Sequence, residues 1–124
     1  MPRKGFTLIE LLMVIVIIGL LASIAIPKLA NTRERAVVAS MKSDLRNLVT
    51  AEEAYFSDSM KYTTNLGAAR YRTTAGVIGP TIILTGDGWT ARVAHGSTTK
   101  ICTVYTGSTP LAPALKEGAP RCTP

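Results

Sequence analysis

The residues from Phe6 to Pro27 form an apolar run that contains a single charged side chain, Glu10. As a helix rising about 1.5 Å per residue, this run would span roughly 33 Å, which matches the hydrocarbon core of a bilayer. A small compact domain could not cover a helix that is apolar on every side. The run therefore predicts a membrane-spanning helix.

A cleavable signal peptide is the main alternative for this run. Such a peptide has a shorter apolar stretch that ends at a small-x-small cleavage site, whereas here residues 22–25 are followed by further apolar residues and Pro27. Arg3 and Lys4 favour a cytoplasmic start of the chain. Basic residues on the far flank weaken this charge signal, so the orientation depends on the cysteines considered below.

Glu10 is unusual in a membrane span, because a carboxylate at mid-bilayer costs about 2.5–3.5 kcal/mol on insertion scales. Hydration near the end of the span would reduce that cost. The span itself carries no cation, and a buried anion is stabilised by a cation a few ångströms away. A free amine at Phe6, supplied by a neighbouring chain, is the candidate partner.

The segment Lys4–Leu11, with the sequence KGFTLIEL, resembles the processing motif of type IV prepilins and of type II secretion pseudopilins. In that family a membrane peptidase cuts after the glycine and methylates the new N-terminus. The resemblance implies cleavage between Gly5 and Phe6, removal of residues 1–5 as a leader peptide, and N-methylation of Phe6. It also implies that Glu10 acts in filament assembly.

The helix is predicted to continue beyond Pro27 as an amphipathic stretch over residues 28–58, where apolar side chains recur largely at steps of three or four. This apolar stripe comprises Leu29, Val37, Met41, Leu45, Leu48, Val49, Tyr55 and Phe56. Residues 6–27 are expected to be the transmembrane or filament-core half of one long helix. Gly19 and Pro27 lie where the family has helix-weakening residues, which implies kinks there.

Residues 59–124 are predicted to form a globular head. Met60–Val77 is expected to be an irregular connection. The β-branched stretches Thr81–Thr85, Trp89–His95 and Thr99–Thr106 are separated by glycine-containing turns, which predicts an antiparallel meander of about three strands. One face of that sheet would cover the helix stripe. The fold class is therefore α+β and pilin-like, with a disulfide-tied C-terminal loop.

Cys102 and Cys122 both lie in the last quarter of the chain. They lack the second cysteine pair or the histidines of a zinc site, and an even count in an exported domain reads as one disulfide. This bond would tether the proline-rich tail from Gly107 to Pro124 and would place the C-terminus outside the cytoplasm. A disulfide-bounded C-terminal region is also what the resemblance implies.

No arrangement of residues in the sequence favours an enzyme. The one histidine, His95, has no triad-like partner, the acidic residues are dispersed, and no glycine-rich phosphate loop occurs. We therefore expect no catalytic residue, no cofactor and no metal site. The net charge of +6, or +4 without Arg3 and Lys4, indicates a solvated basic surface more than a nucleic-acid interface.

The resemblance implies a pilin that polymerises with itself into a type IV pilus, a filament that supports adhesion, twitching motility or DNA uptake. Its other partners would be prepilin peptidase, the inner-membrane assembly machinery and, before assembly, membrane lipid; DNA or surfaces would bind only the filament. The precursor would lie in the bacterial inner membrane with its N-terminus in the cytoplasm and its head outside, and the assembled subunit in the extracellular pilus.

Two alternatives to the pilin stay open. The N-terminal motif fits a pseudopilin of a type II secretion system equally well, although the paired cysteines favour a pilin and the lack of an acidic cluster speaks against a calcium-binding pseudopilin. A more distant alternative is a single-span membrane protein with an unrelated extracytoplasmic domain.

Overall fold

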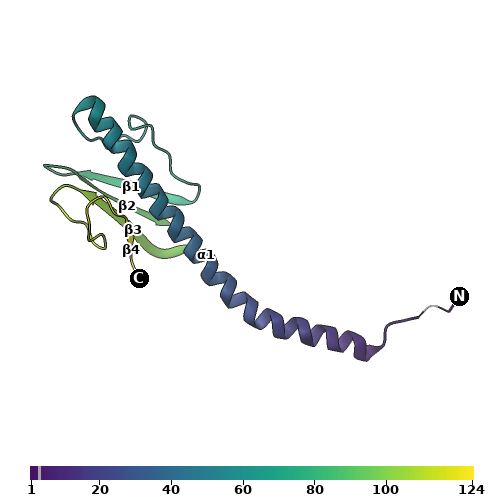
Figure 1. Ribbon diagram of the computed structural model, residues 1–124. Helices are drawn as coiled ribbons and strands as arrows, with labels where there is room; N and C mark the ends of the chain where they lie inside the picture. Colours follow the sequence, from purple (N-terminus) through teal and green to yellow (C-terminus); the bar gives the residue numbers. More distant parts are fainter. Residues whose placement is uncertain (3) are drawn as a thin grey trace. The chain divides into compact units, whose positions relative to one another are not determined.

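The computed structural model describes residues 1–2 and 4–124, and within them the chain forms a long helix followed by a small antiparallel sheet (Figure 1). Arg3, one of the basic residues expected to orient the chain, lies outside the described residues. The elements are α1 (Leu8–Ser59), β1 (Val77–Leu84), β2 (Trp89–His95), β3 (Thr98–Thr106) and β4 (Arg121–Cys122). Two compact units divide the chain, residues 1–33 and residues 34–124. The predicted α+β, pilin-like fold is confirmed.

The first unit contains the apolar part of α1. The helix begins at Leu8, two residues later than predicted, and runs without interruption through Gly19 and Pro27. Proline lacks the N–H that would bond to the carbonyl one turn earlier, and glycine lowers helix stability. The kinks expected at these two positions stay a prediction.

The core of the second unit lies between α1 and one face of the sheet. On the helix, Met41, Leu45 and Leu48 have no exposed surface and recur at steps of four and three residues. They form one cluster with side chains of β2 and β3, namely Trp89, Ala91, Val93, Cys102 and Val104. These strand residues alternate along their strands, as expected for side chains that share one face. The predicted packing of the helix stripe on the sheet is confirmed for its central part, from Val37 to Val49. Leu29 is 61% exposed, and Tyr55 and Phe56 lie outside this cluster.

β1 differs from the strand predicted at Thr81–Thr85. It begins at Val77, passes through Pro80 and ends at Leu84, and its register with β2 shifts next to the proline. The sheet order β1-β2-β3-β4 puts β1 at an edge. An edge strand tolerates proline at an irregularity, because the missing N–H removes no central ladder bond. A Gly-Pro pair is typical of a turn, which is why the sequence placed the start too late.

The C-terminal tail was expected to be a loop, but it contributes β4. Cys122 lies opposite Cys102 and Arg121 lies opposite Thr103, so the described residues form a four-stranded sheet in place of the predicted meander of about three strands. β4 has only two residues and shows no hydrophobic alternation. It depends on the disulfide and on the neighbouring strand.

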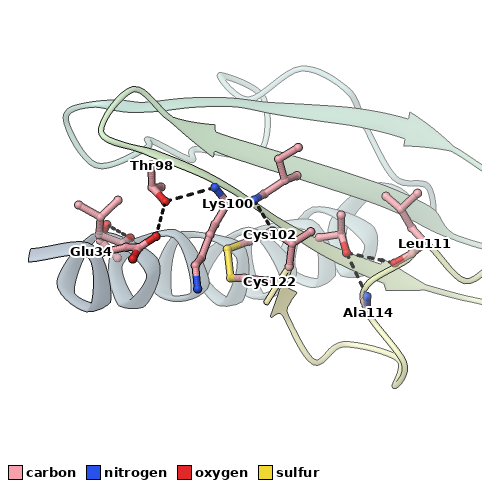
Figure 2. Close-up of a disulfide and its surroundings, with 12 residues drawn as sticks. Glu34, Thr98, Lys100, Cys102, Leu111, Ala114 and Cys122 are labelled. Atoms are coloured by element: carbon pink, nitrogen blue, oxygen red, sulfur yellow. Dashed lines mark hydrogen bonds between the residues drawn. A yellow bond between two sulfur atoms is a disulfide. The ribbon is translucent and has the colours of Figure 1, made fainter. Parts of the chain in front are cut away.

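The rest of the tail covers the sheet face that points away from α1. Thr103 points to that face, because its neighbours along β3 point into the helix-side core. Its Oγ1 donates to the carbonyl of Leu111 at 3.0 Å and accepts from the N–H of Ala114 at 3.1 Å. The N–H of Gly118 donates to the carbonyl of Tyr105 at 2.8 Å. Figure 2 shows the Leu111 and Ala114 contacts beside the disulfide.

The connection from α1 to β1 is held by a buried aspartate. Asp44, one of the charged residues between the stripe positions, is only 3% exposed. Its two carboxylate oxygens accept from the N–H and the hydroxyl of Thr74 at 2.9 and 2.7 Å, and its carbonyl accepts from the hydroxyl of Tyr71 at 2.9 Å. Burial and the charge of Asp44 raise the pKa of Tyr71 to about 12. Long-range contacts therefore bury a side chain whose sequence position indicates exposure.

Candidate functional site

The predicted cleavage bond precedes the first turn of α1. Gly5 and Phe6 lie outside the helix, and the Phe6 side chain is 87% exposed. A Cβ placed on Gly5 would meet no atom within 4 Å. Proteolysis concentrates at exposed backbone outside regular structure. The two residues therefore lie together in a segment that a peptidase could reach, and cleavage there stays a prediction.

Thr7 and Glu10 form a reciprocal set of hydrogen bonds at the start of α1. The N–H and the hydroxyl of Thr7 donate to Oε2 of Glu10 at 2.8 and 2.9 Å, and the N–H of Glu10 donates back to Oγ1 of Thr7 at 3.3 Å. This is a capping box, in which a threonine at the N-cap and a glutamate three residues later satisfy backbone groups that have no helical partner. A negative charge in the first turn is also favourable with the helix dipole.

The capping box adds a contact that the sequence interpretation left out. The span carries no cation for Glu10, as the sequence indicated, but Thr7 supplies two neutral donors to its carboxylate. The signal was present as the Thr-x-x-Glu pattern that starts many helices. Hydrogen bonds do not neutralise the charge, however, so a buried Glu10 still favours a cation nearby.

The apolar half of α1 exposes its large side chains on all sides. Between Leu8 and Leu29 these side chains are Leu8, Ile9, Leu11, Leu12, Met13, Val14, Ile15, Val16, Ile17, Ile18, Leu20, Leu21, Ile24, Ile26 and Leu29. α1 is the helix in the described part of the chain that is long and apolar enough to cross a membrane, and none of its most apolar window is buried. So large an exposed apolar surface marks contact with lipid or with other protein.

The two predicted cysteines are bonded to each other. Cys102 is fully buried in the core cluster and joins Cys122 directly across the β3–β4 pair (Figure 2). Nearby, the hydroxyl of Thr98 at the start of β3 donates to Oε1 of Glu34 on α1 at 3.0 Å. The disulfide therefore closes the tail onto the same small sheet that packs on α1.

The described residues contain no group of three or more His, Cys, Asp or Glu side chains placed to hold a metal ion. The features that the structure does bring together are the exposed segment before α1, the capping box and the uncovered apolar helix. With a head that packs an amphipathic helix on an antiparallel sheet, they define a pilin-like α+β protein.

Comparison with known proteins agrees with this class. Residues 1–26 match the family described as the prokaryotic N-terminal methylation motif. The chain is 45% identical over 62 residues to the type IV major pilin protein PilA of Myxococcus xanthus, covering 49% of this chain and 28% of that protein. It is 46% identical over 65 residues to the type IV wide pilus major component PilA4 of Thermus thermophilus, covering 52% of this chain and 50% of that protein.

A further relative comes from a secretion system. The chain is 44% identical over 66 residues to the type II secretion system core protein G of Escherichia coli, covering 52% of this chain and 46% of that protein. The chain thus spans half or less of the length of these relatives. These matches confirm the resemblance to the pilin and pseudopilin family that the N-terminal residues predicted.

Proposed function

We propose that this chain is a pilin subunit that polymerises with copies of itself into a type IV pilus. The observation that carries the proposal is that the methylation motif of residues 1–26 leads directly into a helix whose apolar side chains are uncovered. Burying an aliphatic side chain contributes about 1.5–3 kcal/mol relative to leaving it in water. A helix of this kind is therefore stored in lipid and finally covered by the helices of neighbouring subunits.

Lipid and a bundle of aliphatic helices are similarly apolar, so hydrophobicity alone gives little preference for the filament over the membrane. A specific contact has to provide that preference. The proposed contact joins the carboxylate of Glu10 to the methylated amine of Phe6 from an adjacent subunit, once prepilin peptidase has removed residues 1–5. This pair fixes the axial register of a subunit, because a misplaced subunit leaves both charges buried and unpaired.

The proposed division of the chain follows from this role. Residues 6–27 form the filament core, residues 28–58 connect the core to the head, and residues 59–124 form the exposed head. The precursor lies in the inner membrane with its start in the cytoplasm and its disulfide outside, where oxidation is possible. Adhesion, motility and binding of DNA or surfaces are proposed for the filament only, whose repeated basic heads favour polyanions.

A pseudopilin is the second candidate, favoured by the similarity to core protein G of type II secretion systems. The disulfide supports the pilin, because a surface filament gains from a covalently closed tail. Deletion of the gene separates the two functions. Loss of surface filaments with normal protein secretion supports the pilin, whereas loss of secretion with filaments retained supports the pseudopilin.

Intact-mass analysis of purified filaments tests the processing step. We expect a mature chain that begins at Phe6 and carries one extra methyl group. A mature N-terminus near Ile26 would identify an ordinary signal peptide and would end the pilin interpretation. The precursor in membranes of a peptidase-deficient strain is the control, and its mass should include residues 1–5.

A further inference from the structure

Glu52 is a buried carboxyl group in the second compact unit, residues 34–124, that neither the proposed assembly nor the proposed processing uses. It lies one helical turn after Leu48 on the core-facing side of α1 and has no exposed surface. Its Oε2 accepts from the N–H of Thr63 at 3.0 Å. Its Oε1 has no hydrogen-bond partner among residues 1–2 and 4–124. The carboxyl group of Glu52 thus holds the segment that follows α1 through one oxygen, while its other oxygen has no partner.

The surroundings of Glu52 supply negative charge and aromatic rings. From the same helix, Oε1 of Glu53 accepts from the hydroxyl of Tyr62 at 3.0 Å. The ring of Tyr62 stacks on Phe56 with centroids 4.7 Å apart and meets the ring of Trp89 edge-on at 6.4 Å.

The surroundings of Tyr62 favour its neutral hydroxyl over the charged phenolate. Burial and the bond to Glu53 raise the pKa of Tyr62 to about 12, and the charges of Glu52, Glu53 and Glu117 all add to this shift. Acidic groups of α1 and of the C-terminal tail therefore act on Tyr62, the residue directly before Thr63.

Buried polar atoms gather at the same end of the sheet. In the described part of the chain, Oγ1 of Thr85, Nε1 of Trp89 and Oγ1 of Thr106 are buried without a hydrogen-bond partner, as is Oε1 of Glu52. Trp89 lies directly opposite Thr106 on β3, and Thr85 follows the β1 residue opposite Trp89. This end of the head is the part of its core where polar groups are least satisfied.

A buried carboxylate with one donor is costly, because charge loses hydration that a single hydrogen bond does not replace. Burial raises the pKa of Glu52, the bond from Thr63 opposes this effect, and the charge of Glu53 adds to it. The neutral carboxyl group fits the site better, since it keeps an acceptor for the Thr63 N–H without carrying the charge.

We propose that Glu52 is a pH-responsive latch for the tip of the head. Neutral Glu52 holds residues 60–63 against α1, and ionised Glu52 lets that segment open. Met60, Lys61 and Tyr62 line a groove together with Phe56 and the β1–β2 turn, so the latch controls the shape of this groove. The latch does not depend on polymerisation, because every group named lies within the second compact unit, residues 34–124.

The sign of the pH dependence follows from the raised pKa. The closed segment is most stable below the pKa of an exposed glutamate, about 4.3, and loses stability as the pH rises through the higher pKa of buried Glu52. Between these two values the opening constant should rise about tenfold for each pH unit. Above and below this window it should be constant.

Amide hydrogen exchange of the full mature chain in detergent micelles tests the latch. The reported quantity is the protection factor of the peptide that contains Thr63, corrected for intrinsic exchange, from pH 4 to pH 8. Glu52→Gln removes the charge and keeps the acceptor, and Glu53→Gln is the matched control on the adjacent exposed position. Trp89 emission, which is sensitive to the contact with Tyr62, is recorded on the same samples.

We expect protection near Thr63 to fall with rising pH in the wild type and to stay constant in Glu52→Gln. In Glu53→Gln it should also fall, but over a narrower pH window, because the lost charge no longer helps to raise the pKa of Glu52. Trp89 emission should follow the same pattern. A wild-type protection factor that does not change with pH overturns the proposal, even if the glutamine variant fails to fold. Equal pH profiles for the wild type and Glu52→Gln also overturn it.

Discussion

Substitutions at Glu10 and Thr7 separate two roles of the same carboxylate, capping α1 and pairing with an amine. Glutamine at position 10 can still accept from the N–H of Thr7, because glutamine serves in capping boxes as glutamate does. Glu10→Gln therefore removes the charge and keeps the cap. Thr7→Val removes the Oγ1 bonds at 2.9 and 3.3 Å and keeps the charge.

The two variants should differ in magnitude. Loss of an N-cap side chain costs about 1 kcal/mol, which corresponds to roughly a fivefold change in an equilibrium constant. Loss of one partner from a buried ion pair costs about 3–5 kcal/mol, which corresponds to more than about a hundredfold. Glu10→Gln should therefore abolish or sharply reduce filaments, and Thr7→Val should reduce them modestly.

Filament yield after shearing, measured by immunoblot, is the assay. The mature subunit in the membrane fraction is measured in parallel, because insertion and cleavage should survive in Glu10→Gln and in Glu10→Ala. Removing a charge makes the span more apolar, so the level of mature subunit in the membrane should not fall. A loss of filaments at an unchanged membrane level is then a defect of assembly. Wild-type filament yield from Glu10→Gln refutes the pairing and leaves capping as the role of Glu10. Equal losses in Glu10→Gln and Thr7→Val would assign the defect to the helix start.

The remaining predictions concern the head. Alkylation of surface filaments without reductant should label neither Cys102 nor Cys122, and labelling of both thiols would contradict the bond and the topology. Reduction should lower the free energy of unfolding by about 3 kcal/mol, because the bond closes a loop of 20 residues. Asp44→Ala should destabilise the head by roughly 2–4 kcal/mol, because two donors of Thr74 lose a charged acceptor. Urea unfolding of the full chain in micelles, followed by tryptophan fluorescence, measures this cost, and a loss below about 0.5 kcal/mol in Asp44→Ala would show that the connection is held elsewhere.

The sequence was most informative where structure is local. The apolar run, its length and the Gly5–Glu10 motif predicted the helix and the candidate site, because a span and a processing motif are contiguous in the chain. The stripe of Met41, Leu45 and Leu48 was readable for the same reason, since a helix brings residues three and four apart to one face. The capping box is equally local, because Thr7 and Glu10 lie three residues apart.

Strand limits and buried charges depended on contacts between distant residues. Pro80 lies inside β1 because the edge of the sheet tolerates it there. The two residues of β4 pair with β3 because a disulfide joins Cys122 to Cys102, which precedes it by 20 residues. No local pattern marks either feature.

The sequence by itself determined the long apolar helix, the methylation motif at its start and a small β-containing region after it. Only the tertiary structure decided which polar side chains the head buries. Asp44 and Glu52 are buried at 3% and 0% exposure because the segments ending at Thr74 and Thr63 fold back onto α1 and supply their hydrogen bonds. Helical periodicity specifies which way a side chain points, but burial depends on what the rest of the chain places against it.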